Sequence, residues 1–147
     1  MNAVPRRCVI DASILVKCLI PEVETHFVRQ FLRDLLTDTA AIVAVPDLLY
    51  AECANVLWKK AQRGEVDMRI AENNLTELLS MELSVTLTRE LIIRAIRLSC
   101  DHHISAYDAC YLTLAERLDV PLLTADERLA SRLADSSHVV MTLASLR

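Results

Sequence analysis

Cys8-Val9-Ile10-Asp11 is a short apolar run that stops at an acid, and it predicts a strand buried on both faces. Further apolar runs predict strands over residues 40–45, 83–87, 121–124 and 139–143. Amphipathic patterns predict helices over residues 22–36, 46–63, 67–81, 88–100, 105–118 and 126–134. Asp67 and Thr88 are predicted to cap the third and the fourth of these helices. Strands that alternate with helices favour an α/β fold with a mainly parallel sheet, covered on both faces, in a single domain over residues 1–147.

Composition favours a folded domain over a disordered chain. The 147 residues are 53% hydrophobic and 24% charged, which is enough apolar material for a substantial core. Gly64 is the one glycine, and it follows the helix predicted to end at Arg63, where a left-handed cap is needed. Phosphate-binding loops and nucleophile elbows that need two or more glycines are therefore excluded.

Charge, cysteine content and the length of the apolar runs indicate which partners and which redox compartment the protein has. The 16 Lys and Arg against 20 Asp and Glu give a net charge of −4, which disfavours a general nucleic-acid-binding surface. The five cysteines include no Cys-x-x-Cys pair, so buried thiols in a reducing cytoplasm are expected. No run approaches the roughly 20 apolar residues of a membrane helix, so no membrane partner is expected.

Two acids follow predicted strands, at the edge where open parallel sheets bind ligands. Asp11 closes the first strand, and Asp126 lies two residues past the strand that ends at Thr124. The structural alternative for both acids is a helix N-cap. Residues 124–127 also fit a capping box with Thr124 as the cap. The sequence leaves both interpretations open.

Asp108 lies within the apolar stripe of the helix predicted over residues 105–118. Tyr111 and Leu112, about one turn later, share its side of the helix. A carboxylate among apolar side chains needs a partner or a metal ion, because burying an unpaired charge is costly. The alternative is a capping box from Ser105 to Asp108, which would satisfy the carboxylate locally.

Glu52 lies at the margin between the apolar and polar sides of the helix predicted over residues 46–63. Its polar side continues through Asn55, Lys59 and Arg63. This stripe is either a solvated helix face or the lining of a cleft. In the second case, Lys59 and Arg63 are candidates for binding phosphates of a substrate.

These four acids come from four parts of the chain and can converge on one site. Carboxylate oxygens are the ligands that hard divalent cations such as Mg²⁺ prefer. A pair of such ions activates a water and stabilises both oxygens of an in-line phosphodiester displacement. This chemistry needs acids and no glycine loop, so the sequence is compatible with metal-dependent phosphodiester hydrolysis.

Four short motifs, in order along nearly the whole chain, resemble those of the PIN domain family. The motifs are Val9-Ile10-Asp11-Ala12-Ser13, Pro46–Glu52 with Asn55–Lys60, Tyr107-Asp108-Ala109 with residues 111–116, and Leu122–Asp126. The resemblance is greatest to the VapC-like toxins of bacterial and archaeal toxin–antitoxin pairs. Cys18, Cys53 and Asp119 depart from the family pattern, but none of them replaces an acid.

The resemblance implies a three-layer α/β/α sandwich and a metal-dependent endoribonuclease that uses Mg²⁺ or Mn²⁺. The family's catalytic and metal-binding acids match Asp11, Glu52, Asp108 and Asp126. The polar residues that orient these acids or waters match Ser13, Asn55 and Thr124. The resemblance also implies an RNA substrate, a homodimer, and a cognate antitoxin protein that blocks the site with a C-terminal segment.

Two other functions are considered. A non-catalytic PIN-like module would bind RNA or protein without cutting, although such a scaffold has no need of four complete acids. A phospho-acceptor receiver domain also uses acids at strand ends, but it needs an acid pair at the first strand and a lysine after a late strand. The first strand offers only Asp11 and no lysine follows Lys60, so the receiver function is disfavoured.

Overall fold

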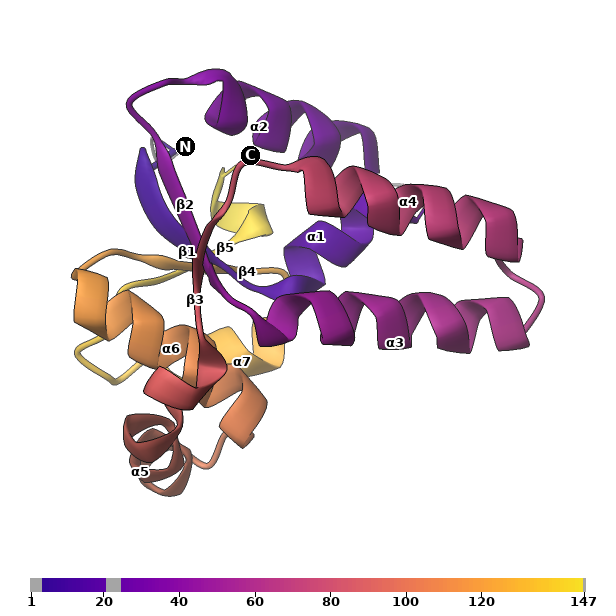
Figure 1. Ribbon diagram of the computed structural model, residues 1–147. Helices are drawn as coiled ribbons and strands as arrows, with labels where there is room; N and C mark the ends of the chain where they lie inside the picture. Colours follow the sequence, from indigo (N-terminus) through magenta and orange to yellow (C-terminus); the bar gives the residue numbers. More distant parts are fainter. Residues whose placement is uncertain (1–3, 21–24, 147) are drawn as a thin grey trace.

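Parallel strands form the central sheet of the computed structural model (Figure 1). The structure describes residues 4–20 and 25–146, and within them the sheet has five strands in the order β3-β2-β1-β4-β5. The strands are β1 (Arg7–Ile10), β2 (Ile42–Pro46), β3 (Ser84–Thr86), β4 (Leu122–Thr124) and β5 (Val140–Thr142). Every predicted strand is present and every neighbouring pair is parallel, which confirms the predicted sheet.

Helices connect the strands. They are α1 (Ala12–Leu19), α2 (Thr25–Thr37), α3 (Leu48–Gln62), α4 (Met68–Ser80), α5 (Ile92–His102), α6 (Ala106–Leu118) and α7 (Glu127–Arg132), with short 3-10 helices η1 (Thr88–Glu90) and η2 (Leu143–Leu146). The sequence pattern predicts all of the α-helices except α1, whose eight residues are mostly apolar and largely buried. Residues 22–24, where the helix predicted over residues 22–36 begins, lie outside the described residues.

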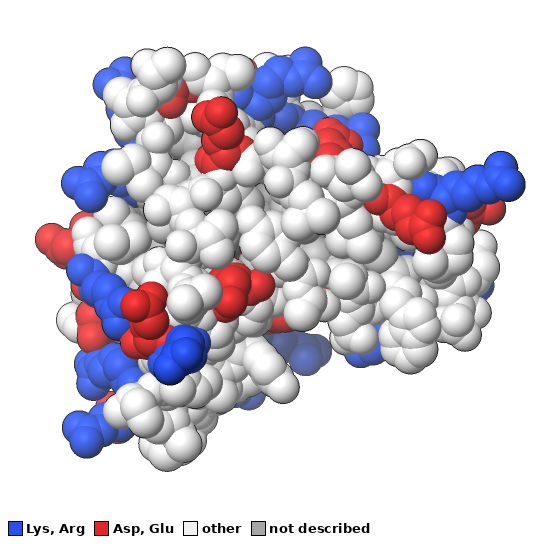
Figure 2. All heavy atoms as spheres, in the orientation of Figure 1, with Lys and Arg blue, Asp and Glu red and all other residues white. Residues whose placement is uncertain are grey.

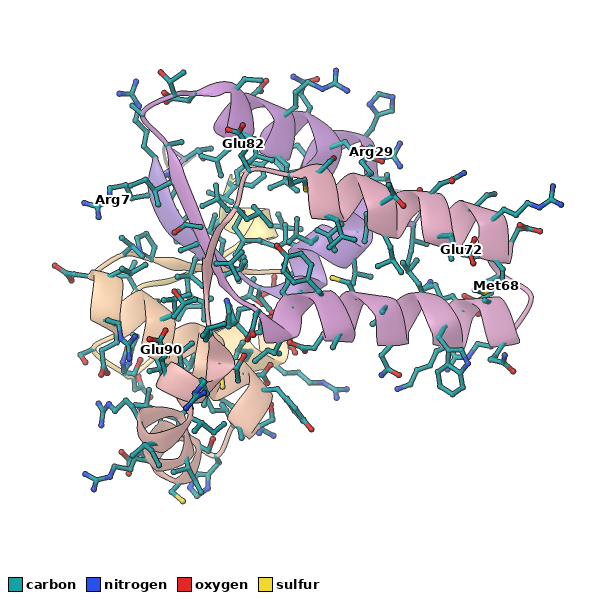
Figure 3. All side chains as sticks on the ribbon, viewed as in Figure 1. Arg7, Arg29, Met68, Glu72, Glu82 and Glu90 are labelled. Atoms are coloured by element: carbon teal, nitrogen blue, oxygen red, sulfur yellow. The ribbon has the colours of Figure 1, made fainter. Side chains whose placement is uncertain are left out.

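The helices cover both faces of the sheet and give the three-layer α/β/α arrangement implied by the motifs. The chain moves from β1 to β2 to β3 in one direction and then crosses back to β4. Because such crossovers are right-handed, α1–α4 lie on one face and α5–α7 on the other (Figure 1). The pair α3 and α4 projects beyond the sheet, with Met68 and Glu72 on the outer part of α4 (Figure 3).

Burial from both sides explains the apolar sequence of the strands. Residues 8–10 are each at most 1% exposed, and Leu122 and Leu123 are fully buried. The helix α6 packs between the sheet and α5, so residues 109–115 are buried on every side of the helix. The polar residue among them, Thr113, donates its hydroxyl to a backbone carbonyl one turn earlier, at 2.7 Å. The central strands and α6 therefore form the core.

Two helix ends show the predicted chemistry. Gly64 follows α3 with a φ of +71°, and its N–H donates to the carbonyl of Ala61. This confirms the left-handed cap, a conformation that glycine adopts without steric cost. Asp67 precedes α4, and its carboxylate accepts a hydrogen bond from the N–H of Arg69. The predicted cap at Asp67 is therefore also present.

The prediction that Thr88 caps a helix running to Cys100 is wrong. Thr88 begins the short helix η1, and α5 starts only at Ile92. The Thr88 N–H donates to the Asp47 carboxylate at 2.7 Å, and its hydroxyl oxygen accepts from the N–H of Leu48 at 3.2 Å. These bonds join the end of β3 to the start of α3. They fix the orientation of the helix that carries Glu52.

Charged side chains of both signs are interspersed around a largely uncharged centre on the face shown in Figure 2. Mixed charges of this kind produce little long-range attraction for a polyanion. Among the described residues, no helix has the length and apolar character required to cross a membrane.

Candidate active site

The structure brings the four acids singled out from the sequence into one pocket. Asp11, Glu52, Asp108 and Asp126 line a pocket of about 290 Å³, together with Ala12, Ser13, Val16, Asn55 and Val56. The pocket lies at the carboxyl ends of β1 and β4. Here the chain's connections leave neighbouring strands in opposite directions, which is the place where open α/β sheets bind ligands.

Asp11 is held by two hydroxyl groups. It directly follows β1 and is 5% exposed. The Ser13 hydroxyl donates to Asp11 Oδ2 at 2.8 Å, and the Thr124 hydroxyl donates to the same oxygen at 2.7 Å. Burial raises the pKa of Asp11 above its usual range, and the two hydroxyl groups oppose that rise. Asp11 occupies the N-cap position of α1 but makes no side-chain capping bond, so capping does not account for it.

Asp126 does cap a helix, as the structural alternative proposed. Its Oδ1 accepts hydrogen bonds from the N–H groups of Arg128 and Leu129, at 2.9 and 3.1 Å. The prediction that Thr124 is the cap is wrong. The Thr124 hydroxyl oxygen instead accepts from the N–H of Asp126 at 3.0 Å while donating to Asp11. Thr124 therefore couples the ends of β1 and β4, and capping and pocket lining coexist at Asp126.

Glu52 lies on the second turn of α3 and accepts a hydrogen bond from a residue that the sequence analysis did not select. The hydroxyl of Tyr111, a fully buried residue of α6, donates to Glu52 Oε1 at 2.7 Å. Burial raises the pKa of Glu52 to about 7, with further contributions from Asp11 and Asp108, against the Tyr111 hydrogen bond. In the sequence, the only indication that Tyr111 belongs to the site is its position one turn after Asp108, on the same helix face.

Asp108 lies in the first turn of α6, half-buried at the pocket. Its N–H donates to the Ser105 hydroxyl at 3.0 Å, so Ser105 caps α6 as predicted. Burial raises the pKa of Asp108 and the nearby Asp11 carboxylate raises it further, while a hydrogen bond with Ser105 opposes both. The cap fixes the first turn of the helix and leaves the carboxyl group among other acids. Capping alone therefore does not account for Asp108.

The donor set fits a hard divalent cation. The pocket lining combines four carboxyl groups with no Lys or Arg, and burial and mutual repulsion raise the pKa of three of them. Within residues 4–20 and 25–146, no three His, Cys, Asp or Glu side chains are grouped closely enough to hold one ion directly. Mg²⁺ commonly takes one or two carboxylates directly and keeps several waters, so this spacing is compatible with it.

The polar stripe of α3 only partly faces this pocket. Asn55 lines it, but Lys59 and Arg63 do not. Lys59 is exposed, and the Arg63 guanidinium lies 4.0 Å from the carboxylate of Glu65. The structure therefore places Asn55 with the acids and the two basic residues further along the projecting helix.

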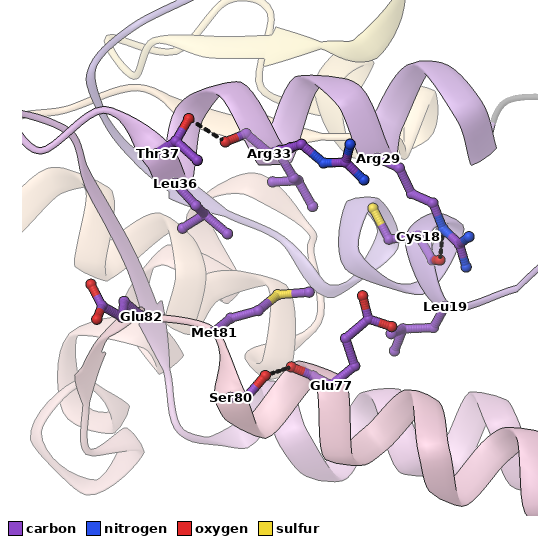
Figure 4. A pocket seen from close by; sticks show the side chains of 11 residues that line it. Cys18, Leu19, Arg29, Arg33, Leu36, Thr37, Glu77, Ser80, Met81 and Glu82 are labelled. Carbon is purple, nitrogen blue, oxygen red and sulfur yellow. Dashed lines mark hydrogen bonds between the residues drawn. The ribbon is translucent and has the colours of Figure 1, made fainter.

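A separate pocket of about 410 Å³ lies between α2 and α4 (Figure 4). Arg29 and Arg33 of α2 and Glu77 of α4 contribute to its lining, and Arg29 Nε donates to the carbonyl of Cys18 at 2.9 Å. None of the four acids described above lines it. The carboxylate chemistry therefore belongs to the pocket at the sheet edge.

Comparisons with known proteins identify the family of this chain. Residues 8–135 match the family model of the PIN domain. The chain is 33% identical over 128 residues to ribonuclease VapC3 of Pyrobaculum aerophilum. The aligned residues cover 86% of this chain and 94% of that protein.

Two solved structures share the fold. The crystal structure of PAE2754 from Pyrobaculum aerophilum superposes with a TM-score of 0.72 at 23% identity, covering 95% of this chain and 85% of that one. A toxin–antitoxin complex from Klebsiella pneumoniae has a TM-score of 0.61 at 16% identity, covering 91% of this chain and 96% of that one.

Proposed function

Because this chain belongs to the PIN domain family, we propose that it is a metal-dependent endoribonuclease and the toxin of a toxin–antitoxin pair. The single observation that supports this most is the meeting of Asp11, Glu52, Asp108 and Asp126 at one pocket. The 33% identity to a protein named ribonuclease VapC3 supports RNA as the substrate.

We propose that the four acids hold Mg²⁺ or Mn²⁺. A divalent cation bound there supplies an activated water and charge stabilisation for phosphodiester hydrolysis. The chain's own residues prepare the carboxylates for this. Ser13 and Thr124 hold Asp11 by hydrogen bonds, and Tyr111 holds one oxygen of Glu52, which lines the pocket. Asn55 is the amide on the pocket wall and is suited to orienting a water or a substrate oxygen.

The proposed partners follow from the same family. We expect a cognate antitoxin, in line with the toxin–antitoxin complex from Klebsiella pneumoniae that shares the fold. We also expect a homodimer that acts on RNA in the cytoplasm. Both expectations rest on the motif resemblance described above.

The test is RNA cleavage by the purified chain, freed of any antitoxin. We expect cleavage of total RNA with Mg²⁺ or Mn²⁺ and none with a chelator. Asp108→Asn should abolish cleavage while circular dichroism remains native, because it replaces a charge with an amide of the same shape. The matched control is Asp101→Asn, at an exposed position of α5, which should cut like the wild type.

Wild-type protein that cuts no RNA with either metal would overturn the proposed function. If that protein still bound RNA or a protein partner, the result would support the alternative function, a non-catalytic binding module. Cleavage that survives Asp108→Asn would reject the assignment of the site while leaving the activity intact.

A further inference from the structure

A second, more open hollow adjoins the acid pocket. Ser13, Lys17, Ala125, Asp126, Glu127 and Arg128 line it. Ser13 and Asp126 belong to both linings, so the two depressions meet at these side chains. A polymer whose cut bond lies among the acids has to continue across a neighbouring surface. This hollow is a surface that shares two residues with the acid pocket.

The hollow is walled by two helices from opposite faces of the sheet. Lys17 lies on α1, one turn after Ser13, and Arg128 lies on the first turn of α7, two residues after Asp126. Both helices begin at the carboxyl ends of β1 and β4, which are neighbouring strands. The chain thus places one basic side chain on each side of the edge at which the acids gather.

Charge divides the two depressions into different chemical roles. The acid pocket has no basic side chain in its lining, whereas the hollow has two basic residues, Lys17 and Arg128, beside the acids Asp126 and Glu127. Phosphate groups of a single strand are bound mainly by Lys and Arg, and these contacts do not depend on base sequence. Divalent ions at the acids would serve the phosphate being cut, but adjacent phosphates need cations from the protein.

We propose that the hollow between α1 and α7 is a binding subsite for the RNA backbone, with Lys17 and Arg128 each contacting a different phosphate near the one that is cut. The proposal rests on the proposed nuclease function and adds the path of its substrate. It assigns backbone binding to this pair in place of Lys59 and Arg63, which line neither depression. Glu127 weakens the attraction at the same place.

The test measures binding without cutting, in an Asp108→Asn background with Mg²⁺. Fluorescence anisotropy follows a short, labelled, random-sequence single-stranded RNA over a series of salt concentrations. Each lost phosphate contact lowers the slope of log K against log salt by about 0.7 for single strands. Lys17→Gln with Arg128→Gln should therefore lower the slope by about 1.4 and weaken binding. Arg128→Gln alone changes an exposed side chain and should lower it by about half as much.

Two control variants test whether the effect depends on where the charge is lost and on its sign. Lys59→Gln with Arg63→Gln removes two charges from α3 and should leave the slope unchanged. Glu127→Gln should tighten binding, because it removes one of the two acids that line the hollow. Circular dichroism and Mn²⁺ binding of every variant should match those of the background protein.

The outcomes separate this inference from the function on which it rests. An unchanged slope in the Lys17 and Arg128 variants, with a loss in the Lys59 and Arg63 variants, would overturn the subsite and leave the nuclease proposal standing. If the wild type neither bound nor cut RNA, both proposals would fail together.

Discussion

The Tyr111 hydroxyl donates a 2.7 Å hydrogen bond to Glu52 Oε1 and joins α6 to α3 beside the acid pocket. Tyr111 has no exposed surface, and its buried hydroxyl has Glu52 as a hydrogen-bond acceptor. The bond fixes the rotamer of a carboxylate whose partners on the pocket side are other acids. It makes Tyr111 a positioning residue for the proposed metal site.

Tyr111→Phe should weaken metal binding. The change removes one oxygen and preserves the ring, so the core stays packed while Glu52 loses its anchor. Residues that orient metal-binding groups typically contribute about 10- to 100-fold in metal affinity or activity. Isothermal titration with Mn²⁺ measures the affinity directly. Tyr107→Phe is the matched control, since Tyr107 is 66% exposed on the same helix. Equal Mn²⁺ affinities for Tyr111→Phe and the wild type would refute the positioning role.

Thr124→Val should reduce both stability and activity. Thr124 is fully buried, and its hydroxyl donates to Asp11 and accepts from the N–H of Asp126. Without this hydroxyl, the Asp11 carboxylate loses a hydrogen-bond donor and the N–H of Asp126 loses its acceptor. This loss lowers the unfolding free energy by about 1–3 kcal/mol. Thr124→Ser keeps the hydroxyl and should retain most of the activity. Chemical denaturation and RNA cleavage measure the two effects, and a fully active Thr124→Val would show that Ser13 alone suffices.

Metal-free protein should become less stable as pH rises. Burial raises the pKa of Glu52 from 4.5 to about 7, and Asp11 and Asp108 are raised as well. For an acid whose pKa is higher in the folded state, the folded state binds protons more tightly than the unfolded state. Its stability contribution is therefore complete below the unfolded pKa and is lost as pH rises through the folded value.

Thermal unfolding between about pH 5 and about pH 8 in the presence of a chelator tests this prediction. Glu52→Gln should flatten the decline, because a glutamine does not titrate. Saturating Mn²⁺ should reverse it, because cation binding favours the ionised carboxylates. A metal-free wild type whose melting temperature increases over this range would contradict the sign of the effect.

Gly64→Ala should destabilise the fold by roughly 1 kcal/mol. Gly64 has a φ of +71°, and a Cβ placed there would meet no atom within 4 Å. The cost therefore comes from backbone strain and not from a clash. Gly64→Asn should cost less, since Asn tolerates the left-handed region better. Urea denaturation of both variants, with RNA cleavage as a control for the site, measures the difference. An Ala variant as stable as the wild type would contradict the strain argument.

The strands and most helices were predictable because their signals are local. Each strand is a short apolar run, and the caps at Asp67 and Ser105 are visible in the sequence. The helix α1 was not predictable, because a buried eight-residue segment with the single basic residue Lys17 lacks the polar face that distinguishes a helix from a strand. Thr88 was misplaced because its partner, Asp47, is 41 residues away in the sequence.

In the candidate site too, features with a local sequence signal were predictable, and features that depend on distant parts of the chain were not. The acids could be selected one by one from strand ends and from a charge within an apolar stripe. Their convergence depends on strand order, which the pattern of runs does not specify. Tyr111 resembled a core residue in the sequence, and only the fold brings its hydroxyl within hydrogen-bond distance of Glu52. The position of Lys17 beside Arg128 likewise depends on β1 and β4 being neighbours.

The bond between Thr124 and Asp11 spans 113 residues of sequence and has a consequence for the protein during its synthesis. A ribosome that has released the first three strands has already exposed Asp11 and Glu52, but β4 and Asp126 are still missing. The edge of β1 that receives β4 stays unpaired until β4 emerges. A nascent chain that has not yet reached β4, or one that terminates before it, therefore has no assembled pocket. The order of the strands therefore delays assembly of the pocket until β4 and Asp126 have been synthesised.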